Sequence, residues 1–205
     1  MSNVLTDEAR YKAGKSQMGT FLSNQYLMWR IVLVKSIRKI ILTADEFYTD
    51  ILPEEITQDE DVVNNEIRNG WLYEAMAQSE QAIEDLFSLL KNSTDIAYFA
   101  KNVVNYRATE VKNYIWNFKY DDIEYFMEQF KLPFFDLDDA EAWGEHQDVF
   151  EEYKKSVLLM QDYLKRLIQY HKLYYLDYCQ YKHGMAVALK HSERHIRQRR
   201  KEKVC

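Results

Sequence analysis

The chain has 205 residues, of which 47% are hydrophobic and 29% are charged, and it carries a net charge of −6 at pH 7. This length suits one domain that buries a core of its own, and the composition excludes an intrinsically disordered chain. Five glycines and two prolines leave few positions for turns, which favours long helices over many short strands.

Cysteine content and hydropathy indicate the compartment. The two cysteines, Cys179 and Cys205, show no CxxC spacing and form no disulfide framework. Residues 1–19 are polar, and the most apolar run, at 26–42, is interrupted by four Lys or Arg. We therefore expect a soluble, reduced, cytoplasmic protein with no transmembrane segment. Because this apolar run also contains cations, an alternative is a helix that lies on the surface of a membrane.

Charge is distributed unevenly along the chain. Residues 190–205 contain seven Lys or Arg and two Glu, a net charge of +5, which leaves −11 on the other 189 residues. A basic tail on an acidic body is typical of a segment that binds nucleic acid or mediates self-association. We predict a single helical domain at 1–189 and a basic C-terminal tail at 190–205. The candidate nucleic-acid contacts in this tail are Arg194, Arg197, Arg199, Arg200 and Lys201.

Apolar residues recur at helical spacing through the first half of the chain. We predict a first helix from about Thr20 to Asp50, ended by Pro53. The alternative for the β-branched run at 31–34 is a short strand. The next two expected helices form an antiparallel hairpin because their connector is short. They run from Asn64 or Asn65 to about Lys91, and from Ile96 to Phe118.

The second half of the chain continues with a short and a long helix. The short helix is expected from Asp121, as its cap, to about Lys131, before Pro133. The long helix carries apolar and aromatic residues from Phe150 to Tyr181 at alternating three- and four-residue steps. Its roughly 35 residues span about 50 Å, so we expect it either to break near Tyr174 or to extend toward a partner. The predicted fold is all-α: an up-and-down helical bundle with a long C-terminal helix and a basic tail.

The candidate site lies where the last helix is expected to end. Tyr181, Lys182 and His183 stand directly before Gly184, and such a glycine is typical of a helix C-terminus. The free carbonyls there favour a protonated His or Lys. We assign His183 an acid–base or phosphate-facing role, supported by the charge of Lys182. Tyr181 and Tyr178 are binding candidates that offer hydroxyl groups and stacking surfaces.

Two further binding candidates lie in the predicted hairpin. Glu80 and Glu84 are one turn apart beside apolar residues, and the simplest interpretation is a solvated helix face. Alternatively, Glu84 or Arg107 points into the groove that receives His183. An acid beside an imidazole stabilises its protonated form and fixes its tautomer, which general acid–base catalysis exploits.

The sequence lacks the motifs of metal and cofactor sites. Cys179 and His183 are four residues apart, but two ligands do not complete a zinc site. No Glu is followed by His three residues later, as a di-metal bundle requires. The scattered glycines form no phosphate loop and no dinucleotide fingerprint. We predict no metal site and no cofactor.

Two segments give the chain a resemblance to the HEPN superfamily of small helical domains. One is the hairpin from about Asn65 to Phe118 with its segment at 80–84, and the other is the Tyr-Lys-His-Gly ending at 181–184. The resemblance implies a helical bundle that is often dimeric. We expect the protein partner to be a second copy of the chain or another helical protein. It also implies a prokaryotic defence or toxin–antitoxin setting and RNA or a nucleotide as ligand.

The same resemblance bears on catalysis. Ribonuclease members carry an Arg separated from the catalytic His by four to six residues, whereas this chain has Tyr178, Asp177 and Leu176 at those places. Lys182 is then the cation available beside His183. As an enzyme, the protein would be a divergent, metal-independent ribonuclease that uses these two residues. The alternative is a non-catalytic interaction or scaffold protein whose aromatic helix face pairs with a second chain.

Overall fold

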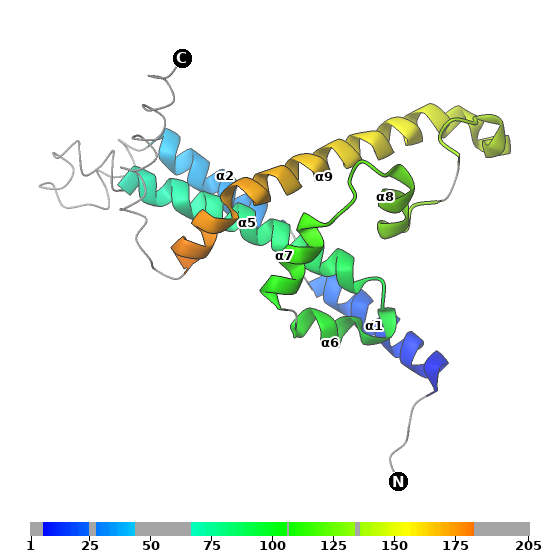
Figure 1. The fold of residues 1–205 in the computed structure, drawn as a ribbon, viewed down its shortest axis with the longest axis horizontal. Helices are drawn as coiled ribbons and strands as arrows, with labels where there is room; N and C mark the ends of the chain where they lie inside the picture. The colour runs from blue at the N-terminus through cyan, green and yellow to red at the C-terminus, as the bar shows by residue number, and fades with distance from the viewer. Residues whose placement is uncertain (1–5, 25–27, 44–66, 106, 134–135, 183–205) are drawn as a thin grey trace, which may run out of the picture. The chain divides into compact units, whose positions relative to one another are not determined.

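The computed structural model describes residues 6–24, 28–43, 67–105, 107–133 and 136–182 (Figure 1). Every regular element in these ranges is a helix, which confirms the all-α prediction and excludes a strand at 31–34. The α-helices are α1 (Asp7–Asn24), α2 (Trp29–Leu42), α5 (Arg68–Asn92), α6 (Phe99–Val104), α7 (Ala108–Trp116), α8 (Ile123–Gln129) and α9 (Gln147–Lys182). Two short 3-10 turns, η2 (Ile96–Tyr98) and η3 (Glu141–His146), accompany them.

The chain divides into two compact units. The first unit comprises Met1–Tyr26 and Ile83–Lys172, and the second comprises Leu27–Ala82 and Leu173–Cys205. The divisions fall inside α5 and inside α9, so each of these helices contributes one part to each unit. The predicted boundary between a domain at 1–189 and a tail at 190–205 lies outside the described residues.

The core of the first unit confirms that the predicted hairpin is antiparallel. The ring of Phe87 on α5 meets the edges of Tyr114 and Phe118, while Lys91, one turn later on α5, pairs with Glu110 near the start of α7. Later residues of α5 therefore contact earlier residues of α7, as in an antiparallel pair of helices. Buried side chains from α5, α7, α8 and α9 complete this core; they include Ile83, Val111, Ile115, Phe126, Val157, Leu164 and Ile168.

The N-terminal prediction was wrong about where the helices begin and end. A single helix was expected from about Thr20 to Asp50, but α1 ends at Asn24 and α2 begins at Trp29. Apolar spacing did not reveal α1, because this helix is polar and contains two glycines. Gly14 is buried against the backbone of η2, where a Cβ would collide with the carbonyl oxygen of Ile96. That close approach compensates for the low helix propensity of glycine.

The predicted third helix, from Ile96 to Phe118, is divided into η2, α6 and α7. α6 ends at Val104, and Arg107 has extended backbone angles (φ −101°, ψ 128°) as the N-cap of α7. Buried Phe99 and Val111 lie on either side of this interruption. Apolar spacing alone did not reveal it, because a turn between two helices can preserve the helical period on each side.

The short helix starts one residue later than predicted. Asp122, not Asp121, caps α8, and its carboxylate accepts a hydrogen bond from the backbone N–H of Tyr125 (3.0 Å). After α8, Lys131 adopts a positive φ of 54°, and the N–H of Leu132 reaches the carbonyl of Met127 (2.9 Å). This left-handed residue ends the helix just before Pro133.

The long C-terminal helix is confirmed. α9 has 36 residues and continues through Tyr174, so the predicted alternative of a break is wrong. Phe150, Val157 and Leu164 of the predicted apolar face are buried. Met160 and Leu167, which were expected on the same face, are exposed. The face that packs in the first unit is therefore narrower than the apolar pattern suggested.

Candidate functional site

The predicted site at the end of α9 is described only up to Lys182. His183 and Gly184 lie outside the described residues, as do the five candidate contacts of the basic tail. Lys182 is exposed, and its ammonium group lies 5.6 Å from the ring centroid of Tyr178. The Tyr178 hydroxyl donates a hydrogen bond to Gln81 on α5 (2.9 Å). The structure thus brings Tyr178 and Lys182 together, and it uses the Tyr178 hydroxyl to hold α9 on α5 within the second unit.

Tyr181 is also engaged within the second unit. Its hydroxyl donates a hydrogen bond to Glu74 on α5 (2.5 Å), and its ring stacks on Tyr73 with a 6.4 Å centroid separation. Glu74 accepts a second bond from Gln78 (2.8 Å), and Gln78 in turn accepts one from Arg30 on α2 (2.8 Å). The hydrogen bond to Glu74, with burial, raises the pKa of Tyr181 to about 12. Tyr181 therefore stays protonated at neutral pH and cannot act as a base there.

The two candidates in the hairpin have contrasting environments. Glu84 is buried (1% exposed), as is Glu80 (0%), so the solvated-face interpretation is wrong for both. Arg107 is exposed at the start of α7, where its charge contributes to the lowered pKa of Glu110 after the larger effects of Lys91. Glu84 and Arg107 belong to the first unit, whereas Tyr178, Tyr181 and Lys182 belong to the second.

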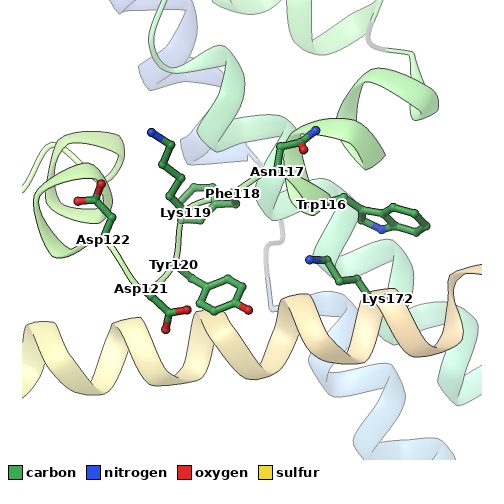
Figure 2. A pocket seen from close by; sticks show the side chains of 8 residues that line it. All are labelled: Trp116, Asn117, Phe118, Lys119, Tyr120, Asp121, Asp122 and Lys172. Carbon is green, nitrogen blue, oxygen red and sulfur yellow. The ribbon is translucent and has the colours of Figure 1, made fainter.

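A pocket that the sequence did not predict lies in the first unit, between α7, α8 and α9 (Figure 2). Its volume is about 500 Å³, within the range of small-ligand sites. The lining comes from the last residue of α7, from the segment that joins α7 to α8 and from one residue of α9. It comprises Trp116, Asn117, Phe118, Lys119, Tyr120, Asp121, Asp122 and Lys172. Figure 2 shows Trp116 and Lys172 at one side of the pocket and Asp122 at the other.

The lining of this pocket combines aromatic rings with two lysines and two aspartates. Trp116 is 39% exposed, and the ammonium group of Lys112 lies 4.3 Å from its ring centroid. Lys119 and Lys172 are exposed and make no salt bridge in the part of the chain that the structure describes. The ammonium group of Lys119 lies 5.7 Å from the ring centroid of Tyr125, whereas Figure 2 shows Lys172 beside Trp116. An exposed indole beside Lys172 suits a ligand that is both aromatic and anionic.

Both carboxylates of the pocket already have cationic or N–H partners. Asp121 pairs with Lys165 of α9 (2.9 Å), and this contact raises the pKa of Lys165. Asp122 accepts the capping hydrogen bond at the start of α8. These acids therefore repel an anion less than free carboxylates would. The sequence pattern predicted Asp121 as a helix cap and gave no role to Trp116 or Lys172; only the fold shows that the three residues line one pocket.

Two other kinds of site receive no support from the described residues. They contain no group of three or more His, Cys, Asp or Glu placed to hold a metal ion. None of the helices assigned there combines the length and the apolar character needed to cross a membrane.

Comparison with known proteins adds no assignment. No protein-family model, no curated protein and no solved structure matches the chain.

Proposed function

We propose that this chain binds RNA or a nucleotide in the pocket between α7, α8 and α9. The observation that carries this proposal is the presence of Trp116, Lys119 and Lys172 around one cavity of about 500 Å³. An exposed indole offers a stacking surface for a base, and such stacking is tolerant of sequence. Ammonium groups attract the phosphate that accompanies each base.

Local charge supports an anionic ligand although the whole chain is acidic. Lys165 neutralises Asp121, and the backbone of α8 uses the carboxylate of Asp122. Lys119 and Lys172 therefore carry two positive charges in the lining, against the one negative charge of Asp122, which the capping hydrogen bond does not neutralise. Since the lining residues are largely exposed, one nucleotide unit of a flexible single strand can enter. A duplex is a poorer ligand because its bases are already stacked and paired.

Two features of the sequence support the same ligand class. The resemblance to HEPN domains implies RNA or a nucleotide and a defence or toxin–antitoxin setting. The basic residues at 190–205 supply charge for additional phosphate contacts. The proposal concerns binding; cleavage by His183 with Lys182 is the ribonuclease hypothesis, which the same experiment addresses.

The test is a titration of fluorescein-labelled single-stranded RNA, followed by anisotropy at two salt concentrations. Trp116→Ala should weaken binding about tenfold or more, because stacking on one aromatic ring is worth about 1–3 kcal/mol. Lys172→Glu should weaken binding and reduce the salt dependence by about one phosphate contact. Electrophoresis of the same RNA, beside His183→Ala, reports cleavage.

The matched control is Lys155→Glu, because Lys155 is an exposed lysine of the same helix that does not line the pocket. It carries the same charge change and should retain wild-type affinity apart from a small general electrostatic effect. Equal losses for Lys155→Glu and Lys172→Glu, together with unchanged binding by Trp116→Ala, contradict the pocket as the site. Absence of binding to RNA and to mononucleotides contradicts the whole proposal.

A helical interaction protein is the second candidate, and the exposed apolar side of α9 favours it. Met160, Tyr163 and Leu167 are all exposed, at steps of three and four residues. Beside them, Asp162 and Arg166 form a salt bridge one turn apart (2.7 Å). A second copy in antiparallel orientation would place each acid opposite the other copy's arginine, as a two-fold interface requires. Light scattering should then report a dimer that Tyr163→Glu converts to a monomer; a monomeric wild type removes this candidate.

A further inference from the structure

α2 has the highest net positive charge of the helices that the structure describes. Its 14 residues include Arg30, Lys35, Arg38 and Lys39 and no acid, in a chain whose net charge is −6. Lys35, Arg38 and Lys39 are exposed. A cluster of like charges is costly unless solvent or an anionic partner compensates it, so this helix is suited to an anionic surface.

The same helix exposes large apolar side chains. Trp29 is 57% exposed and Val32 is 51% exposed, and they are accompanied by exposed Met28, Ile31 and Leu42. Single exposed apolar residues are ordinary, but five on or directly before one 14-residue helix are not scattered. Met28, Val32, Lys35, Lys39 and Leu42 follow steps of four and three residues, so cations and apolar groups share one line along the exposed side.

The opposite side of α2 holds the helix in the second unit. Ile37 is fully buried, and Arg30 donates a hydrogen bond to Gln78 on α5 (2.8 Å). The buried contacts are thus separate from the exposed cationic and apolar residues. Binding by the exposed side does not require α2 to leave its place on α5.

We propose that α2 docks on an anionic lipid surface. In this arrangement Met28, Trp29 and Val32 enter the boundary between headgroups and acyl chains, while Lys35 and Lys39 contact lipid phosphates. Tryptophan is favoured at that depth, and cations near an anionic bilayer strengthen the attachment. A lipid surface is a better partner than RNA, because RNA phosphates provide no apolar contact for exposed Val32 or Leu42. The helix lies on the surface and does not cross it, since no helix among those described is long and apolar enough to span a membrane.

The experiment is sedimentation of the full chain with phosphatidylcholine vesicles, with and without phosphatidylserine. Wild type should bind the anionic vesicles and not the neutral ones. The triple variant Lys35→Glu/Arg38→Glu/Lys39→Glu should bind at least about tenfold less. Val32→Asn should also reduce binding, because it removes an apolar contact and leaves the charge unchanged. Circular dichroism establishes that each variant is folded.

Two controls separate this surface from the other basic regions. Lys155→Glu, on α9, should bind vesicles as the wild type does. In the second control, Arg194, Arg197, Arg199, Arg200 and Lys201 are all replaced by Gln in the full chain. Binding that is lost in this tail variant and kept in the α2 variant overturns the proposal, as does failure of the wild type to bind anionic vesicles. RNA binding by the α2 variant reports separately on the pocket, so the two proposals fail independently.

Discussion

The hydroxyl of Tyr181 donates a hydrogen bond to the carboxylate of Glu74 and so ties the last turn of α9 to α5. Glu74 also accepts a bond from Gln78, which accepts one from Arg30, so the contact extends to α2. A residue that the sequence marked as a ligand-binding candidate therefore joins three helices of the second unit. Because its hydroxyl is already used, Tyr181 is better placed to position the chain before His183 than to bind a ligand itself.

Removing this hydroxyl should destabilise the protein by an amount typical of one hydrogen bond. We expect Tyr181→Phe to lower the free energy of unfolding by about 1 kcal/mol, because the ring and its stacking on Tyr73 remain. Urea denaturation measures the change as a lower midpoint at constant slope. Tyr163→Phe is the matched control. This tyrosine of α9 is 56% exposed, and removal of its hydroxyl group should leave the denaturation midpoint unchanged.

The same hydrogen bond predicts a pH dependence. Glu74 and burial raise the pKa of Tyr181 from 10.0 to about 12, so the folded state retains a proton that the unfolded state loses. The contribution of Tyr181 is complete below pH 10 and is lost as the pH rises from 10 through 12. The difference in unfolding midpoint between wild type and Tyr181→Phe should therefore shrink over that interval. A difference that stays constant up to pH 12 would show that the hydroxyl is not the group responsible.

The parts of the fold that follow from helical periodicity were predictable from sequence. The apolar steps from Phe150 to Tyr181 predicted α9, and the short connector after Lys91 predicted the antiparallel hairpin in which Phe87 contacts Tyr114. The interruption between α6 and α7 was not predictable in this way, because the apolar period shows which side of a helix is buried and not where the chain turns. Likewise, the polar helix α1 depends on a tertiary contact at Gly14 rather than on an apolar face.

The candidate site was less predictable than the fold. Tyr178 and Lys182 are close together, as their four-residue spacing on a helix requires. The pocket was missed because Lys172 comes to line one cavity with Trp116 and Asp121 only through packing of α9 on the segment after α7. Residues that are dozens of positions apart carry no local pattern, so no motif indicated this cavity.

The contact between α1 and η2 predicts opposite effects for two glycines of one helix. Gly14→Ala should destabilise the protein by about 1–3 kcal/mol, since the new methyl group would collide with the Ile96 carbonyl and come within 2.9 Å of the Cα of Ala97. In Gly19→Ala the new methyl group meets no atom within 4 Å beyond the neighbouring residues and backbone of its own helix, so this substitution should stabilise the protein by about 0.5–1 kcal/mol through helix propensity. Thermal unfolding distinguishes the two. A stabilising Gly14→Ala would mean that the helix does not approach η2 closely.

The end of α8 predicts a stabilising substitution at Lys131. Its φ of 54° lies in the left-handed region, which costs energy for any residue with a Cβ. Lys131→Gly should raise the free energy of unfolding by about 0.5–1 kcal/mol, because glycine adopts this conformation without that cost. Lys131→Ala removes the same charge and keeps the Cβ, so it should leave stability nearly unchanged. Equal effects of the two substitutions would assign the gain to charge instead of backbone conformation.

The start of α8 separates two adjacent acids that the sequence alone could not distinguish. Asp122→Ala should cost about 1 kcal/mol, because it removes the acceptor for the Tyr125 N–H at the first turn of the helix. Asp121→Ala removes only an exposed ion pair with Lys165, and such pairs contribute little because solvent screens them. Urea denaturation of both variants should show a clear loss for Asp122 and a much smaller one for Asp121, and Asp122→Asn should retain most of the wild-type stability because Asn is also a good N-cap. A larger loss for Asp121→Ala than for Asp122→Ala would show that Asp121 caps the helix, and α8 would then begin where the sequence pattern predicted.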